Sequence, residues 1–283
     1  MVDTHKELKD LLINSSSEGV LTWAQQADLA ERSMLSPAEI EAQAFDLGIV
    51  PLRYKRNFDA ITLSEQVLLF NSRITVVGCG GLGGYILQEL ARLGVGTVCA
   101  WDGDSFEEHN LNRQALAYID GIGQSKVKAA AQIIKVINPA VEFIGFNRRF
   151  VGEVDEEYLI GTDVVIDALD NVSNRLLLAR VCRKLNIPLI HGAVNGWYGQ
   201  LCTQFPEDTT IEQIYEHYSL DQTKTSASTV LGFVPAALAS LQVAEAVKVL
   251  LGRGKLLRGK LMIINMLDMD VDILEIKPGK YQL

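Results

Sequence analysis

The chain has 283 residues, of which 48% are hydrophobic and 22% charged, and its formal net charge is −9. This balance is typical of a globular protein that buries a full core, and it excludes extensive disorder. The acidic surplus argues against nucleic acid as a partner, because a phosphate backbone rewards dense Lys and Arg. The length suits a helical N-terminal extension over residues 1–50 and one large domain over residues 51–283.

The N-terminal 50 residues carry Ala, Glu and Leu at helical spacing. Thr22 and Ser36 each stand before a run typical of a helix start, and Pro37 occupies the first helical position of the second run. The two helices have a helix-turn-helix character, which admits a DNA-binding role. The acidic charge favours a packing or dimerisation arm instead.

Strand-like and helix-like runs alternate from Ile74 onward. Such alternation predicts right-handed crossovers and a doubly wound, Rossmann-like α/β fold with a mostly parallel sheet. Later strand-like runs are expected to extend the sheet with antiparallel strands. The expected helices cover residues 85–93 (ended by Gly94), 126–137 and 172–185, and the expected strands cover residues 74–77, 97–100, 141–146, 163–169, 188–194, 200–205, 260–266 and 270–276.

The apolar stretch from Val230 to Leu251 is long enough to suggest a membrane span. Gln242, Glu245 and Lys248 recur within it at every third residue and would form one polar stripe on a helix. We therefore expect a long, largely buried helix with one functional or solvated edge, and no membrane association.

The four cysteines, Cys79, Cys99, Cys182 and Cys202, include no C-x-x-C pair, disulfide framework or zinc spacing. Apolar, strand-like surroundings favour core positions for Cys79 and Cys99. With no signal segment at the N-terminus, we expect a cytoplasmic protein.

Residues 78–83 read Gly-Cys-Gly-Gly-Leu-Gly and fit the pattern G-x-G-x-x-G between an expected strand and an expected helix. Such glycines permit a tight turn, let phosphate approach the backbone and expose helix N–H groups to an anion. Some loops of this kind only pack a helix on a strand, but the strand–turn–helix context favours nucleotide binding. The candidate glycines are Gly78, Gly80, Gly81 and Gly83.

Asp102 and Asp104 follow the next expected strand, where a carboxylate takes the ribose hydroxyls in nucleotide-binding folds. Asp102 lies closer to the strand end. Up to this point the chain could equally be a nicotinamide-dependent oxidoreductase, which remains the less favoured alternative.

Positive charge and amide donors then gather on the ligand side of the sheet. They come from Asn110, Arg113, Gln114 and Lys126. A dehydrogenase needs little beyond a pyrophosphate cradle, whereas a triphosphate that loses pyrophosphate needs stabilisation of charge on the leaving group. The set therefore favours a nucleoside triphosphate.

Asp170 and Asn171 stand at the end of another expected strand, and ligands bind at strand carboxyl ends in such sheets. A carboxylate facing a triphosphate is a natural Mg²⁺ ligand. Asp170 could instead cap the helix expected to begin near Val172, and the two roles can coexist.

A set of motifs runs through the chain in order from about residue 53 to residue 268. It comprises R-Y-x-R-N (53–57), G-C-G-G-L-G (78–83), D-G-D (102–104), N-L-N-R-Q (110–114), G-x-S-K (123–126), D-A-L-D-N (167–171) and S-L-Q-V-A-E-A-V-K (240–248). In order and spacing the set resembles the MoeB/ThiF/HesA family, bacterial relatives of ubiquitin-activating enzymes. The resemblance implies an adenylyltransferase that uses ATP and Mg²⁺ to activate the C-terminal Gly carboxylate of a small ubiquitin-like (β-grasp) sulfur carrier ending in Gly-Gly, with release of pyrophosphate.

The resemblance also implies roles by motif position. Arg56 would reach the γ-phosphate across a homodimer interface, so that each active site is shared between subunits. The other implied roles are the phosphate loop for Gly81, the ribose for Asp102, the phosphates for Asn110, Arg113 and Lys126, and Mg²⁺ for Asp170.

Two features common in the family are missing. No C-x-x-C pair follows Phe205 or stands at the C-terminus, so we expect no zinc. The stretch Lys224 to Thr229 stands where many members have a cysteine, and a hydroxyl without a base is a poor substitute for a thiolate. Cys202 is the nearest alternative, although its strand-like setting favours the core. We expect a separate sulfur donor, and a non-catalytic nucleotide- or carrier-binding relative remains the alternative.

Three further residues lie where a substrate tail would be expected. His191 stands at a strand end, and a structural role is favoured for it. Trp197 and Tyr198 could line a tail channel or simply pack. The sequence does not name the carrier or its pathway, which could be molybdopterin, tungstopterin or thiamin synthesis.

Overall fold

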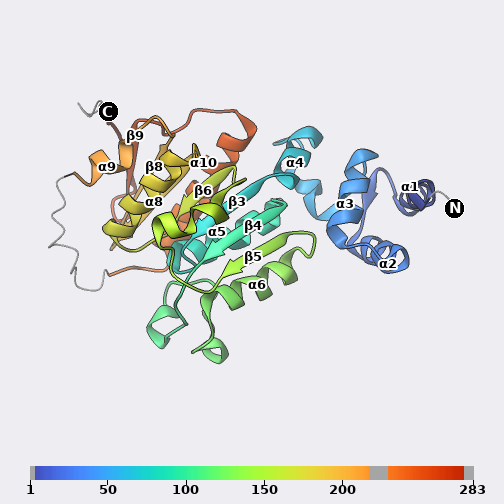
Figure 1. The fold of residues 1–283 in the computed structure, drawn as a ribbon, viewed down its shortest axis with the longest axis horizontal. Helices are drawn as coiled ribbons and strands as arrows, with labels where there is room; N and C mark the ends of the chain where they lie inside the picture. The colour runs from blue at the N-terminus through green and yellow to red at the C-terminus, as the bar shows by residue number, and fades with distance from the viewer. Residues whose placement is uncertain (1–3, 217–228, 277–283) are drawn as a thin grey trace.

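The computed structural model describes residues 4–216 and 229–276. Two bodies with their own apolar clusters follow one another along the chain: a small helical unit at the N-terminus and a larger body built on an eight-stranded sheet (Figure 1). The N-terminal helices lie at one end of the molecule, far from the antiparallel edge of the sheet.

Two of the N-terminal helices begin where the sequence predicts. The side chain of Thr22 accepts the backbone N–H of Gln25, and that of Ser36 accepts the N–H of Glu39, each in a reciprocal capping box. The unit is held by a buried apolar cluster that includes Leu12. Its elements are α1 (Thr4–Ser15), β1 (Val20–Leu21), α2 (Trp23–Ser33), α3 (Pro37–Asp46) and β2 (Val50–Pro51).

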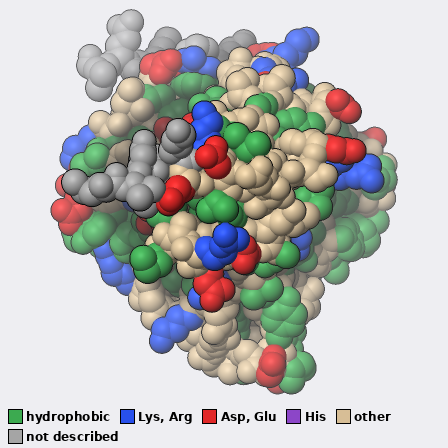
Figure 2. All heavy atoms as spheres, turned by 90° about the vertical axis from the view of Figure 1, so that its right-hand side faces the viewer, with side chains coloured by type: hydrophobic (Ala, Val, Ile, Leu, Met, Phe, Trp, Pro, Cys, Tyr) green, Lys and Arg blue, Asp and Glu red, His purple; other side chains and the backbone are tan. Residues whose placement is uncertain are grey.

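Acidic and basic side chains are mixed over the face of the molecule that the N-terminal helices present (Figure 2). Lys and Arg do not gather there into one basic surface. A DNA-binding helix pair needs such a surface to neutralise phosphates, so the mixed charge favours the packing or dimerisation role.

The eight-stranded sheet confirms the predicted doubly wound fold. Its strands are β3 (Arg73–Val77), β4 (Thr97–Trp101), β5 (Glu142–Phe146), β6 (Val164–Asp167), β7 (Leu189–Asn195), β8 (Tyr198–Gln204), β9 (Lys260–Asn265) and β10 (Asp270–Glu275). They lie in the order β10-β9-β8-β7-β6-β3-β4-β5. The strands from β7 to β5 in this order are parallel, and β8, β9 and β10 extend them with antiparallel pairs.

Helices cover both faces of this sheet. One buried cluster joins the sheet to α5, α6 and α10, and a second joins it to α8 and α9 on the other face. The central strands β3 and β6 are buried on both sides, which explains their continuous apolar runs. The helices are α4 (Leu63–Phe70), α5 (Gly81–Leu93), α6 (Lys126–Ile137), α7 (Glu156–Leu159), α8 (Val172–Lys184), α9 (Thr210–Ile214) and α10 (Phe233–Leu251), with short 3₁₀ turns η1 (Leu52–Asn57), η2 (Glu108–Asn110), η3 (Ile119–Gly121) and η4 (Gly152–Asp155).

Several element ends differ from the sequence-based expectation. Helix α5 begins at Gly81, four residues before the predicted start, because the last glycines of the loop already adopt helical geometry. Strand β6 ends at Asp167 rather than at residue 169. The N–H of Ala168 still donates to Val77 O at 3.0 Å, and the chain turns away from the sheet after this residue. As predicted, Gly94 ends α5 in a left-handed conformation with φ of 76°.

Helix α10 is long and apolar enough, by length and composition alone, to cross a membrane. In the fold it packs against α5 and the strands β6, β7 and β8. Its polar stripe faces inward: Gln242 and Glu245 are buried, and Gln242 donates to Asp167 O at 2.8 Å. The alternative of a solvated edge is therefore wrong for these two residues. Gln242 supplies a donor to a strand-end carbonyl, and Glu245 accepts from the Thr203 hydroxyl at 2.6 Å and from the N–H of Leu257 at 3.0 Å.

Candidate functional site

A cavity of about 390 Å³ opens at the carboxyl ends of β3, β4 and β6. Its wall includes the glycine loop, the turn after β4 and the turn after β6. This is the edge at which doubly wound sheets bind ligands. Among the sequence-predicted residues, those that line the cavity are Gly78, Gly80, Gly81, Asp102, Asp104, Arg113, Gln114, Lys126, Asp170 and Asn171.

The glycine loop allows a ligand close approach to the backbone. Gly78 has φ of 109°, and a Cβ there would lie 2.5 Å from Ala168 O, so no other residue fits. A Cβ on Gly83 would overlap the carbonyl oxygen of Gly78, so Gly83 packs α5 against the loop. Gly80 is the N-cap of α5 and offers no side-chain acceptor, which leaves the first N–H groups of the helix for an anion.

Asp102 joins the glycine loop to the end of β4. Its Oδ2 accepts the N–H of Cys79 and its Oδ1 accepts the N–H of Asp104, both at 2.8 Å. Two backbone donors hold the carboxylate in one orientation and leave lone pairs for further donors.

Asp104 lies between two cations. Its carboxylate is 3.5 Å from Lys126 Nζ and 3.4 Å from Arg149 Nη2. The Lys126 side chain is only 9% exposed. A largely buried ammonium interacts more strongly with an anionic ligand than an exposed one would.

Arg113 and Gln114 come from the turn after η2. Arg113 donates through Nη1 to His109 O at 2.9 Å and to Asn112 Oδ1 at 2.8 Å, which leaves its other N–H groups for a ligand. Gln114 is buried, and its Oε1 has no hydrogen-bond partner within residues 4–216 and 229–276. Because Gln114 lines the cavity, this acceptor is open to a ligand or to water.

The sequence left open whether Asp170 binds a cation, caps α8 or does both. Asn171 caps α8 by accepting the N–H of Asn174 at 2.9 Å. The expectation that Asp170 caps this helix is therefore wrong. Within residues 4–216 and 229–276, Asp170 accepts only the Asn171 side-chain amide, at 3.1 Å. It is exposed at the cavity, so its carboxylate is available to a cation.

Three predicted site residues do not line the cavity. Gly83 packs as described above. Asn110 is buried behind the wall, where its Oδ1 accepts the N–H of Glu107 at 3.0 Å and shapes the turn that carries Arg113. Arg56 lies in η1 and is exposed, and within the described residues its guanidinium makes no hydrogen bond or ion pair.

The backbone around Arg56 is nevertheless held firmly. Arg53 pairs with the buried carboxylate of Glu41 at 2.6 Å, and Tyr54 accepts a hydrogen bond from Asn138 at 2.7 Å. The first contact anchors η1 to the N-terminal unit and the second anchors it to the main body. Arg56 thus projects from a fixed base toward solvent.

Sequence reasoning missed other cavity residues, chiefly Arg149, Phe150 and Arg175. Arg149 and Phe150 follow β5, the neighbour of β4 in the sheet. Arg175 stands four residues after the cap of α8, so the first turn of the helix brings it back to the strand end. A signal existed, since each follows an expected strand, but only the strand order tells which strand ends meet.

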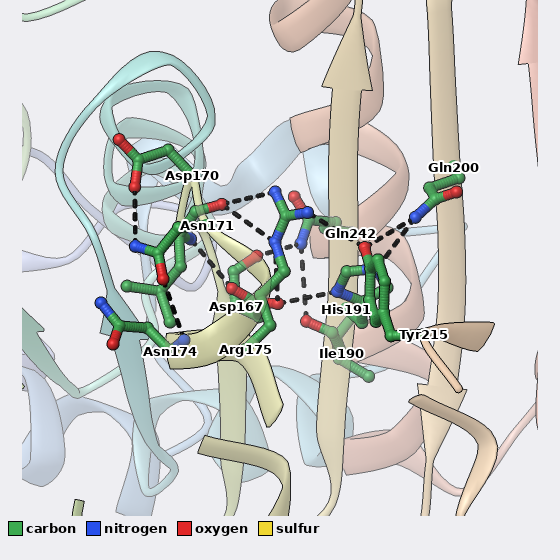
Figure 3. Close-up of polar contacts among 11 residues, drawn as sticks. Asp167, Asp170, Asn171, Asn174, Arg175, Ile190, His191, Gln200, Tyr215 and Gln242 are labelled. Atoms are coloured by element: carbon green, nitrogen blue, oxygen red, sulfur yellow. Dashed lines mark hydrogen bonds and ion pairs between the residues drawn. The ribbon is translucent and has the colours of Figure 1, made fainter. Parts of the chain in front are cut away.

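A buried polar network lies behind the cavity and contains His191 (Figure 3). Asp167 Oδ2 can only accept, so His191 Nδ1–H donates to it at 2.7 Å. The other ring nitrogen then accepts from the Tyr215 hydroxyl at 3.1 Å. Burial is the main cause that lowers the pKa of His191, Asp167 opposes the shift and Arg175 adds to it. The structural role predicted for His191 is confirmed.

The buried pair of His191 and Asp167 makes the free energy of unfolding depend on pH. Because the pKa of His191 is lower in the folded than in the unfolded chain, the unfolded chain binds the proton first as the pH falls. We expect the free energy of unfolding to drop as the pH falls from 6.5 to 5.5, through the proton that this group takes up on unfolding. Urea unfolding of the wild type and of His191→Gln at both pH values measures it. An equal pH dependence in the two proteins would contradict the expectation.

All four cysteines are buried, which confirms the core positions predicted for Cys79, Cys99 and Cys202. Burial is the main cause that raises the pKa of Cys79 and of Cys202, so neither is a thiolate at neutral pH. Thr229 is described, but the remainder of the stretch from Lys224 lies outside the described residues. Trp197 packs on Phe233, with ring centroids 5.1 Å apart, and neither Trp197 nor Tyr198 lines the cavity.

Comparison with known proteins gives the same family as the motifs. A family model described as the ThiF family matches residues 54–282. The SAMP-activating enzyme E1 of Haloferax volcanii is 36% identical over 221 residues, which cover 77% of this chain and 82% of that protein. The sulfur carrier protein ThiS adenylyltransferase of Escherichia coli is 31% identical over 205 residues, covering 71% and 82%.

Two further comparisons bear on length and fold. The maize adenylyltransferase and sulfurtransferase MOCS3-1 is 33% identical over 227 residues, 75% of this chain, which spans only 46% of that longer protein. The crystal structure of Escherichia coli MccB with ATP superposes with a TM-score of 0.70 at 19% identity over 97% of this chain and 89% of that one, a likeness of fold. The chain belongs to the ThiF family and is an adenylyltransferase of that family.

Proposed function

We propose that the protein uses ATP to adenylate the C-terminal glycine carboxylate of a small ubiquitin-like sulfur-carrier protein and releases pyrophosphate. The names of two relatives, a SAMP-activating enzyme and a ThiS adenylyltransferase, point to the carrier. The chemistry is supported by one observation: a single cavity brings together the glycine loop, the cationic side chains of Arg113 and Lys126, and the exposed carboxylate of Asp170.

In this proposal the protein positions two reactants and stabilises charge. The glycine loop and the N-terminus of α5 hold the triphosphate, and Asp102 holds the ribose. The carrier carboxylate attacks the α-phosphate in line, the bond to the bridging oxygen breaks, and pyrophosphate leaves with the charge. Lys126 and Arg113 stabilise that charge as it develops. No protein side chain needs to form a covalent bond.

The residues also fit a magnesium ion. Mg²⁺ usually takes one or two carboxylates together with phosphate oxygens and water. Asp170 offers an exposed carboxylate at the cavity, and it serves neither as a helix cap nor in a salt bridge among the described residues. Asp170 would hold the ion, which would neutralise phosphate charge when bound.

We further propose that the active unit is a homodimer in which Arg56 serves the cavity of the partner subunit. Arg56 is exposed, lies outside its own cavity wall and has no partner within the described residues. An arginine that contacts the γ-phosphate of a nucleotide bound in the partner subunit would have these properties in the isolated chain. Sulfur would then come from a separate donor, because Cys79 and Cys202 are buried thiols.

The reaction is tested by exchange of labelled pyrophosphate into ATP. We expect exchange that requires a carrier ending in Gly-Gly, because pyrophosphate re-enters only through the acyl-adenylate. The same carrier without its last two glycines is the matched control and should give background rates. If none of the ThiS-like or SAMP-like carriers supports exchange, the carrier assignment fails.

A further inference from the structure

One peptide group at the end of β6 is held from both sides. The N–H of Leu169 donates to Asp167 Oδ1 at 2.9 Å. Its carbonyl oxygen accepts two hydrogen bonds from the Arg175 guanidinium, at 3.3 Å from Nε and 2.7 Å from Nη2 (Figure 3). Leu169 directly precedes Asp170, so these bonds restrict the backbone that carries the Asp170 carboxylate.

Arg175 is itself fixed by the network behind the cavity. Its Nη1 donates to the Tyr215 hydroxyl at 3.0 Å, and that hydroxyl donates to His191, which donates to Asp167. The contacts therefore form a closed ring from Asp167 through His191, Tyr215 and Arg175 back to the Leu169 peptide. Burial raises the pKa of Tyr215 to about 12, so its hydroxyl keeps the proton that the ring needs.

The guanidinium of Arg175 is largely buried, so it needs partners for its charge. The Arg175 side chain is 10% exposed, and its Nε lies 3.9 Å from Asp167 Oδ2. A charge that is largely removed from water is stable only where it is paired and hydrogen-bonded, which confines the guanidinium to one position. Asp167 is further held through its backbone oxygen, which accepts from Gln242 on α10 at 2.8 Å.

We propose that Arg175 is a positioning residue that aims the Asp170 carboxylate at the metal of a bound Mg·ATP complex. The proposal rests on the proposed function only in taking Asp170 as the magnesium ligand. The guanidinium has no contact with Asp170 itself and acts through the Leu169 carbonyl. Mg²⁺ demands near-ideal octahedral geometry, so a small displacement of its protein ligand weakens binding sharply.

The test measures ATP affinity with and without Mg²⁺ by calorimetry, and it needs no carrier. Wild type should bind ATP more tightly with Mg²⁺ than without it. Asp170→Asn should lose most of this gain. Arg175→Met should lose about tenfold of it while its metal-free Kd for ATP stays within about twofold of wild type. In the double variant Arg175→Met/Asp170→Asn the losses should not add, because both changes remove one interaction.

Arg180→Met supplies the matched control, since Arg180 is exposed on the same helix. It should keep the full magnesium-dependent gain. Tyr215→Phe removes one hydroxyl and should reduce the gain in the same direction but by less than Arg175→Met, which covers the case in which Arg175→Met does not fold.

Three results would overturn the proposal: an unchanged gain in both the Arg175 and Tyr215 variants, additive losses in the double variant, or a comparable loss of metal-free ATP binding in Arg175→Met. The last would place Arg175 on the nucleotide directly. Absence of carrier-dependent exchange together with the expected binding pattern would count against the proposed carrier and leave the role of Arg175 standing.

Discussion

The Asp170→Asn variant is expected to exchange pyrophosphate about 10²–10³ times more slowly than wild type, the effect typical of removing one group that stabilises transition-state charge. The change keeps the size of the side chain and one acceptor oxygen, replaces the other oxygen with an NH₂ donor and removes the charge. Asp170 is exposed and does not cap α8, so the fold should be unaffected. The rate of exchange with a saturating Gly-Gly carrier measures the loss.

Carrier affinity separates a catalytic from a structural role for this carboxylate. We expect the carrier to bind Asp170→Asn nearly as tightly as wild type, because the substitution lies on the nucleotide side of the site. Asp120→Asn, at an exposed carboxylate outside the cavity wall, is the control and should retain full exchange. Exchange that persisted in Asp170→Asn would show that the magnesium assignment is wrong.

The Arg56→Ala variant should lose about 10²-fold in exchange if the guanidinium stabilises phosphate charge from a partner subunit. Mixing this variant with Asp170→Asn should restore part of the lost exchange activity. In a heterodimer of Arg56→Ala and Asp170→Asn, one of the two cavities combines an intact Asp170 with an intact Arg56. Random mixing of equal amounts should therefore restore about one quarter of wild-type activity, given two-fold symmetry.

Subunit exchange must be verified for the mixed sample, for example with two differently tagged variants. Lys55→Ala, at the exposed neighbour of Arg56, is the matched control and should retain activity. If heterodimers are present and the mixture is still inactive, Arg56 does not serve a site shared between subunits.

The elements around the sheet were predictable because their signals are local. Helix α6 spans Lys126–Ile137, the limits that its apolar period and the following Asn-Pro pair indicate. Capping boxes at Thr22 and Ser36 needed only neighbours three residues away. Boundaries failed where distant contacts decide them, as at the end of β6, whose turn is fixed by the hydrogen bond from Ala168 to Val77.

The polar stripe of α10 shows the same limit. Its period was visible, but its direction was not: Gln242 and Glu245 face the sheet because backbone carbonyls and Thr203 require partners there. The sequence likewise offered Asp170 as a cap for α8. In the structure the next residue, Asn171, caps the helix, and the carboxylate of Asp170 stays exposed at the cavity.

The sequence alone determined the fold class, the family and most of the cavity wall, since each depends on short motifs whose chemistry is carried by adjacent residues. Only the tertiary structure decided which strand ends meet. That assembly brings Arg149 and Arg175 to the cavity and leaves Asn110 and Gly83 behind its wall. It also closes the ring behind Asp170 from β6, β7, α8 and the segment after α9, whose residues lie up to 48 positions apart, from Asp167 to Tyr215. No local pattern encodes such contacts, because burial makes polar groups seek partners in space rather than along the chain.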